Sequence, residues 1–110
     1  MKNSKEMLNV TLYFGLDRRE APPVSEEQWQ NFIKEKVTPF FPKGLTVTSG
    51  RGQYLAASGT LYDEDSKVLH VVYEREPDSD EKIEELRSWF CTEYDQESVM
   101  RVDNLAPASW

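Results

Sequence analysis

The first pattern along the chain is an alternation of apolar and polar residues that starts at Met7. Even-numbered positions from Leu8 to Leu16 are apolar, and the residues between them are mostly polar or small. Successive side chains of a β-strand point to opposite faces of a sheet, so this alternation is typical of a half-buried strand. We therefore expect a strand over residues 7–16, followed by an exposed loop that contains Pro22 and Pro23.

A helical pattern follows this loop. Residues Ser25 to Gln28 have the form of a capping box, in which Ser25 accepts from the first turn and Gln28 reaches back to it. The helix should end before Pro39, because the residue ahead of a proline is disfavoured in helical geometry. Apolar residues at helical spacing predict one buried stripe, formed by Trp29, Phe32, Ile33 and Val37.

The middle of the chain predicts a long β-hairpin. Two strand-like segments flank a turn at residues 57–59, and that turn would pair Ser49 with Lys67. Glycine inside a strand marks a bulge or a close backbone approach, and we expect a bulge at residues 50–52 and a second bend at 63–65. The β-branched and aromatic residues after Lys67 predict that the returning strand is a central one.

The last third of the chain predicts a second helix and a final strand. Short polar and acidic residues at 78–81 suit the N-terminus of a helix. We expect the final strand at residues 98–103, and we expect Pro107 to stop it from continuing into the tail. The apolar stripe of the second helix is formed by Ile83, Leu86, Phe90 and Tyr94.

The elements thus follow the order strand, helix, strand, strand, helix, strand. With right-handed crossovers, this βαββαβ order predicts a ferredoxin-like α+β fold: a four-stranded antiparallel sheet with both helices on one face. The 110 residues have room for one such domain. We expect it to span residues 7–104, between a flexible segment at residues 1–6 and a tail at residues 105–110.

Charge and composition exclude several classes of function. The chain has 20 acidic and 13 basic residues, a net charge of −7, which argues against a nucleic-acid partner because phosphate binding needs clustered Lys and Arg. One cysteine and one histidine argue against a disulfide framework or a multi-ligand metal site, and we expect no cofactor. We find no signal-peptide pattern and no apolar run that could span a membrane, so we expect a cytoplasmic protein without membrane association.

The sheet face opposite the helices is the surface where we look for function. If Leu12 faces the helices, then Tyr13 points to the open side, and the same alternation sends His70 outward. On the last strand we expect Met100 and Val102 to be buried, which would turn their neighbours to the open side. The expected ligand or interface residues are Tyr13, His70, Arg101 and Asp103 among Thr11, Val68, Val72 and Val99, with Arg51 and Gln53 within reach from the hairpin.

Proton exchange and anion binding are the chemistry available to this group. His70 belongs to the residue type that titrates near neutral pH, the Tyr13 hydroxyl can donate, and Arg101 can hold a carboxylate through two hydrogen bonds. Arg101 and Asp103 lie two positions apart, so they can equally pair with each other or with a partner chain. A lone histidine on a sheet is more often a surface or interface residue than a catalyst, and we assign no catalytic residue.

Three other motifs do not indicate a function. Residues Gly50 to Gln53 lack the lysine and the following helix of a phosphate-binding loop. The strand after Lys67 lacks the stacking aromatics of the RNA-binding modules that share the fold. Cys91 has no basic residue immediately beside it that would activate its thiol, so we expect a structural cysteine.

A series of segments in fixed order carries a resemblance, namely Leu12–Leu16, Val24–Trp29, Val37–Pro39, Phe41–Val47, Gly50–Gln53 and Gln96–Asp103. Together they resemble the bacterial family known as domain of unknown function 3574, over nearly the whole chain. The resemblance implies a small α+β domain and no established activity or catalytic set. Many members of that family look exported, whereas this sequence starts directly at the domain.

Two functions from different classes remain open. The first is a binding or assembly protein whose open face, with the hairpin, packs against a second copy or another protein. The second is a cofactor-free enzyme or sensor for a small anionic molecule, which Arg101 or Arg51 would hold while His70 moves a proton. We recognise no nucleophile paired with a base, so the sequence favours binding.

Overall fold

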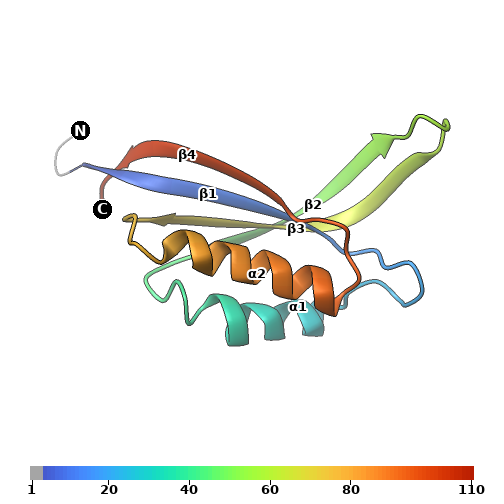
Figure 1. Ribbon diagram of the computed structural model, residues 1–110, viewed down its shortest axis with the longest axis horizontal. Coiled ribbons are helices and arrows are strands. Elements are labelled where there is room, and N and C mark those ends of the chain that lie inside the picture. Colours follow the sequence, from blue (N-terminus) through green and yellow to red (C-terminus); the bar gives the residue numbers. More distant parts are fainter. Residues whose placement is uncertain (1–3) are drawn as a thin grey trace.

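The computed structural model describes residues 4–110, in which four strands form one antiparallel sheet and two helices lie across one of its faces (Figure 1). The strand order is β2-β3-β1-β4, which puts β1 between β3 and β4 and confirms the predicted ferredoxin-like arrangement. Among these residues, neither helix is both long and apolar enough to cross a membrane. The elements are β1 (Lys5–Gly15), α1 (Glu26–Phe32), the π-helical segment η1 (Ile33–Val37), β2 (Thr46–Leu55), β3 (Leu61–Tyr73), α2 (Ser79–Glu93) and β4 (Met100–Ala108).

The first helix begins at the predicted capping box. Ser25 Oγ accepts from the backbone N–H of Gln28 at 3.1 Å, and the Gln28 side chain accepts from the backbone N–H of Ser25 at 2.9 Å. The helical backbone continues through η1, where the Thr38 N–H donates to the carbonyl of Ile33, five residues earlier. The helical path thus ends before Pro39, with Thr38 as its C-cap, as the sequence predicts.

An aromatic cluster forms the centre of the core between the sheet and the helices. Phe14 of β1 contacts Phe90, Trp29 and Phe32, with ring centroids 4.7, 5.1 and 5.5 Å away. Their edge-to-face geometry is one that aromatic pairs prefer. All four residues are at most 1% exposed, so the two helices are fixed to the sheet chiefly through this contact.

The β2–β3 hairpin has the predicted register but not the predicted bulge. Ser49 faces Lys67, and the pairing runs from Thr46–His70 to Leu55–Leu61 without an extra residue. A Cβ at Gly50 would lie 3.1 Å from Ser66 Oγ, so the glycine there permits a close approach across the ladder. The outer half of the hairpin, residues 50–66, extends beyond both helices (Figure 1), and we call it the arm.

The ends of the sheet differ from the prediction. β4 continues past Asp103 to Ala108, and Lys5 pairs with Ala108, so residues 5–6 and 105–108 belong to strands and not to a flexible segment or a tail. β4 accepts Pro107 because it is an edge strand, where a missing N–H need not disturb a ladder on the outer side. Residues 1–3 of the expected flexible segment lie outside the described residues.

Candidate functional site

The face of the sheet that the helices leave uncovered is the first candidate. The strand register places Tyr13 beside Val68 and Met100, and it places Thr11 between His70 and Val102. Side chains directly opposite each other on paired strands lie on the same face. The central positions of this open face are therefore Thr11, Tyr13, Thr46, Thr48, Val68, His70, Val72, Met100 and Val102, together with Asn9 and Asn104.

His70 lies near the middle of the open face, as predicted, but it has few polar neighbours. Its Nε2 is 3.4 Å from Thr48 Oγ1, and the side chain is half-buried. Within residues 4–110, His70 makes no ion pair with a carboxylate. A histidine that moves protons in an enzyme is usually held in orientation by such a group, so this environment suits an uncharged contact surface better than acid–base chemistry.

Charge is concentrated at the ends of this face. The Lys5–Glu74 ion pair, 2.9 Å long, lies at one end, and Glu64 at the other. The Glu64 carboxylate accepts from the backbone N–H of Asp17 at 2.9 Å, so it is already engaged. Between these ends, the described open-face side chains are apolar or neutral, although charged residues make up 30% of the whole sequence.

Arg101 and Asp103 lie on the helix side of the sheet, which corrects the predicted site. β4 places Arg101 opposite Leu12 and Asp103 opposite Val10, and both of those β1 residues are buried under the helices. Val99, expected on the open face, is likewise buried, at 1% exposure. Met100 and Val102 point to the open side instead, so the prediction had the alternation of β4 reversed by one residue.

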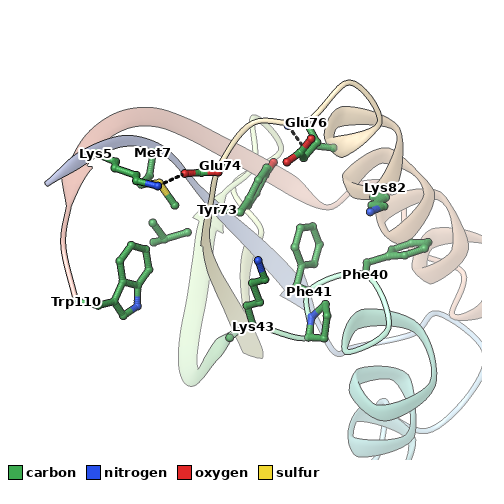
Figure 2. Close-up of a pocket in the computed structure, with 14 residues that line it drawn as sticks. Lys5, Met7, Phe40, Phe41, Lys43, Tyr73, Glu74, Glu76, Lys82 and Trp110 are labelled. Atoms are coloured by element: carbon green, nitrogen blue, oxygen red, sulfur yellow. Dashed lines mark hydrogen bonds and ion pairs between the residues drawn. The ribbon is translucent and has the colours of Figure 1, made fainter. Parts of the chain in front are cut away.

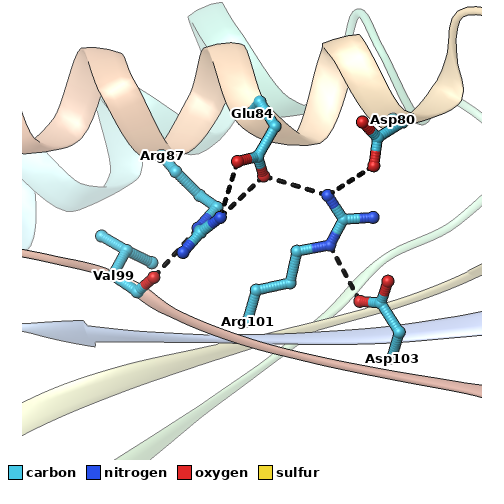
Figure 3. A network of polar contacts seen from close by, with 6 residues as sticks. All are labelled: Asp80, Glu84, Arg87, Val99, Arg101 and Asp103. Atoms are coloured by element: carbon cyan, nitrogen blue, oxygen red, sulfur yellow. Dashed lines mark hydrogen bonds and ion pairs between the residues drawn. The ribbon is translucent and has the colours of Figure 1, made fainter.

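Figure 3 shows how the charge of Arg101 is satisfied. Its Nη1 lies 2.8 Å from Asp80 and 2.9 Å from Glu84 of α2, and its Nε donates to Asp103 at 2.8 Å. Glu84 also accepts from Arg87, whose Nε donates to the carbonyl of Val99 at 2.9 Å. This network connects α2 to β4, and three carboxylates compensate the charge of Arg101.

The pKa shifts in the network follow from these contacts. Burial disfavours the charged form of Arg101, but the hydrogen bonds that it donates to Asp103, Glu84 and Asp80 outweigh this effect and raise the pKa of the guanidinium. The hydrogen bond from Arg87, supported by Arg101, lowers the pKa of Glu84. Both shifts favour the charged forms of Arg101 and Glu84.

Arg51 and Gln53 are also separated from the predicted site. They alternate with Gly50 and Gly52 along β2, so they lie on the side of the hairpin opposite to that of His70. Arg51 pairs with Asp63 at 2.7 Å and with Asp65 at 2.9 Å. These bonds raise the pKa of Arg51 and leave it, like Arg101, with its charge already compensated.

The other reactive side chains do not form a site. Cys91 is half-buried, and this burial raises the pKa of its thiol, which keeps it protonated and weakly nucleophilic. Within residues 4–110, we find no cluster of three or more His, Cys, Asp or Glu side chains placed to hold a metal ion.

Of the predicted site residues, Tyr13 and His70 lie on the open face, and the charged residues do not. Met100 and Val102, which were expected to be buried, also lie there. A cavity lined in part by residues 40–44 and 72–74 was not predicted from the sequence. The paired aromatics Phe40 and Phe41 between two prolines were the available signal, because large apolar side chains in a loop need a surface to cover.

The overall fold is similar to that of two solved structures of a phage SAM lyase. One, in complex with S-methyl-5'-thioadenosine, has a TM-score of 0.69 and 17% sequence identity, and the match covers 94% of this chain and 90% of that chain. The other, in the apo state, has a TM-score of 0.64 and 17% identity, with 96% and 92% covered. At this identity the likeness shows a shared fold. A comparison with curated proteins finds no match. Residues 9–110 match the model of a family described as protein of unknown function, and the chain belongs to this family, DUF3574.

Proposed function

We propose that this protein is a binding protein whose open sheet face packs against another protein surface, with a second copy of the chain as the first partner. The observation that carries this proposal is the lack of charge across the middle of the open face. Interface centres are depleted of charged residues relative to the rest of a protein surface.

The exposed apolar side chains support the same conclusion. Val72, Met100 and Val102 are 41%, 56% and 42% exposed, and Tyr13 is 38% exposed. Tyr13 lies directly opposite Met100, and Val102 is the next residue on the same side of β4, so these three form one patch. Val72 lies on β3 opposite Asn9. A patch of this kind on a soluble domain is characteristic of an interaction surface.

The arm adds a second exposed apolar region. Tyr54 stacks on Tyr62 with ring centroids 4.9 Å apart, yet both rings remain at least half exposed. Leu55 and Leu61 beside them are 71% and 56% exposed. No helix covers the arm in Figure 1, so its side chains gain burial only against another molecule.

Light scattering across a concentration series tests the proposal. The wild-type mass is expected to be about twice the 12.8 kDa of one chain. Val102→Glu should return the protein to a monomer, because a carboxylate would be desolvated at the centre of the interface. Thr92→Glu, which adds the same charge to the exposed surface of α2, is the matched control and should not change the mass. A wild-type monomer would reject self-association, and equal masses for the two variants would reject the open face as the interface.

A second candidate is a cofactor-free enzyme or sensor for a small molecule on the same face. It is favoured by the fold shared with a lyase that was solved with S-methyl-5'-thioadenosine bound. Arg101 and Arg51 are engaged by carboxylates, so His70 and Tyr13 would have to provide the polar contacts. Calorimetric titration with S-methyl-5'-thioadenosine tests this candidate, and equal binding or no binding by wild type and His70→Ala would reject it.

A further inference from the structure

A cavity of about 560 Å³ lies at the end of the sheet opposite the arm. Figure 2 shows that its walls come from segments far apart in the sequence: the start of β1, the loop before β2, the end of β3 and the start of α2. Trp110 closes one side and is itself 88% exposed. The volume falls in the range of cavities that bind metabolite-sized molecules.

The wall formed by β3 is a strand edge that β2 does not pair. The pairing of β2 with β3 starts at Thr46–His70, so Val72 and Tyr73 extend past the end of β2. On an unpaired edge, alternate residues direct both their N–H and their C=O outward. An adjacent donor and acceptor in one plane match the edge of a nitrogen heterocycle.

Aromatic side chains supply the flat surfaces around this edge. Phe41 and Tyr73 lie with ring centroids 5.1 Å apart at 39°, and Phe40 and Trp110 complete the lining. The hydroxyl oxygen of Tyr73 is buried and has no hydrogen-bond partner within residues 4–110. Burial raises the pKa of Tyr73, so the hydroxyl keeps its proton, and the ring of Tyr73 contributes an aromatic surface only.

One ammonium group at the cavity is uncommitted. Lys5 pairs with Glu74 at 2.9 Å, and Lys82 lies 3.5 Å from Asp78. Lys43 makes no ion pair or side-chain hydrogen bond among the described residues, and Figure 2 shows it pointing between Phe41 and Trp110. The carboxylate of Glu76 lies beyond Tyr73 in that view, away from Lys43. The hydrogen bond from Lys5 lowers the pKa of Glu74, and the charge of Lys43 adds a smaller contribution without a direct contact.

We propose that this cavity binds a small molecule that joins a flat heteroaromatic ring to an anionic group, the chemistry of a nucleoside monophosphate. The ring lies against the aromatic side chains with its polar edge toward β3, and the anion pairs with Lys43. The cavity shares Lys5, Val72 and Glu74 with one end of the open face, whereas Tyr13, His70, Met100 and Val102 do not line it.

Adenosine monophosphate is the probe for this proposal, titrated into the whole chain by calorimetry. We expect saturable binding, with adenosine and inorganic phosphate each bound at least about ten-fold more weakly, since each supplies half of the recognised chemistry. Lys43→Ala should weaken binding about ten-fold, and Trp110→Ala should weaken it several-fold. Both residues are exposed, so neither variant should unfold the domain, which circular dichroism can verify.

Lys34→Ala removes an equal charge from η1, outside the cavity, and is the matched control. Equal affinities for Lys43→Ala and Lys34→Ala would overturn the proposal. Absence of saturable binding up to about 10 mM adenosine monophosphate would also overturn it, because a Kd above that concentration corresponds to a binding free energy weaker than about 3 kcal/mol. Adenosine binding as tightly as adenosine monophosphate would remove the anionic group from the proposal. Loss of binding in His70→Ala alone would place the nucleotide on the open face and contradict this site.

Discussion

The two faces of the sheet are built from the same four strands but have opposite environments. Phe14 and Tyr13 are consecutive residues of β1, yet Phe14 is fully buried among three aromatic rings and Tyr13 is 38% exposed. The covered face even accommodates a charged side chain, because α2 brings carboxylates to Arg101. The comparison shows that the presence of a helix layer, more than the residue type, decides which side chains carry stability and which are free for a partner.

The largest expected effect comes from removing one ring on each face. Phe14→Ala should reduce the free energy of unfolding by about 3–5 kcal/mol, through lost burial and the cavity left among the neighbouring rings. Tyr13→Ala should cost much less in the monomer, because that side chain is already partly in water. Urea unfolding at a concentration where the protein is monomeric measures both. Equal losses would show that the open face is as important to the domain as the core.

The second prediction compares the stability lost when Arg101 and Arg51 are each removed from their carboxylates. Arg101→Ala should reduce stability by about 1–3 kcal/mol, because its guanidinium is mostly buried and its removal leaves three carboxylates near one another. Arg51→Ala breaks a pair of similar geometry on the solvent-exposed arm, where water replaces the lost contacts, and a much smaller loss is expected. Thermal unfolding of the two variants checks this order.

The covered network should also give the domain a pH dependence. The hydrogen bond from Arg87 lowers the pKa of Glu84 from its usual 4.5. A carboxyl with a lowered folded-state pKa contributes stability above its unfolded pKa and loses it as the pH falls through the folded value. Stability should therefore fall below about pH 4.5, and Glu84→Gln should flatten this part of the curve. An unchanged acid profile in Glu84→Gln would show that other carboxyls dominate.

The smallest expected effect lies at the tip of the arm. Gly59 has a φ of +92°, which L-residues rarely adopt, so Gly59→Ala should strain the turn by about 1 kcal/mol. Few contacts tie the arm to the core, and the loss should appear as faster amide hydrogen exchange in residues 54–62 with little change in global unfolding. Slower global folding together with a lower unfolding midpoint would instead place the arm within the cooperative unit.

Much of the fold was readable because it depends on local periodicity. The capping box at Ser25 and the spacing of Trp29 and Phe32 are satisfied within a few residues, and the structure confirms them. The pairing of Ser49 with Lys67 follows from a short turn, which sets the register of both strands beyond it.

The site was harder to predict, because the sequence of β4 does not indicate which side of the strand is buried. Valine and methionine alternate with arginine and aspartate in Val99–Asp103, and burying Met100 with Val102 is the ordinary choice. The opposite phase wins because α2 places Asp80 and Glu84 over Arg101. Those acids lie 17 and more residues earlier in the chain, beyond the reach of any local pattern.

The sequence by itself therefore determined the order of the elements, the capping box of α1 and the hairpin register, since each depends on neighbours along the chain. Only the tertiary structure decided which face of β4 is covered, that the arm extends past the helices, and that residues 40–44 meet the end of β3 around a cavity. The physical reason is that the alternation along a strand defines two faces but does not say which of them is buried. The ranking comes from which layer packs on each face, and that depends on contacts between residues distant in sequence.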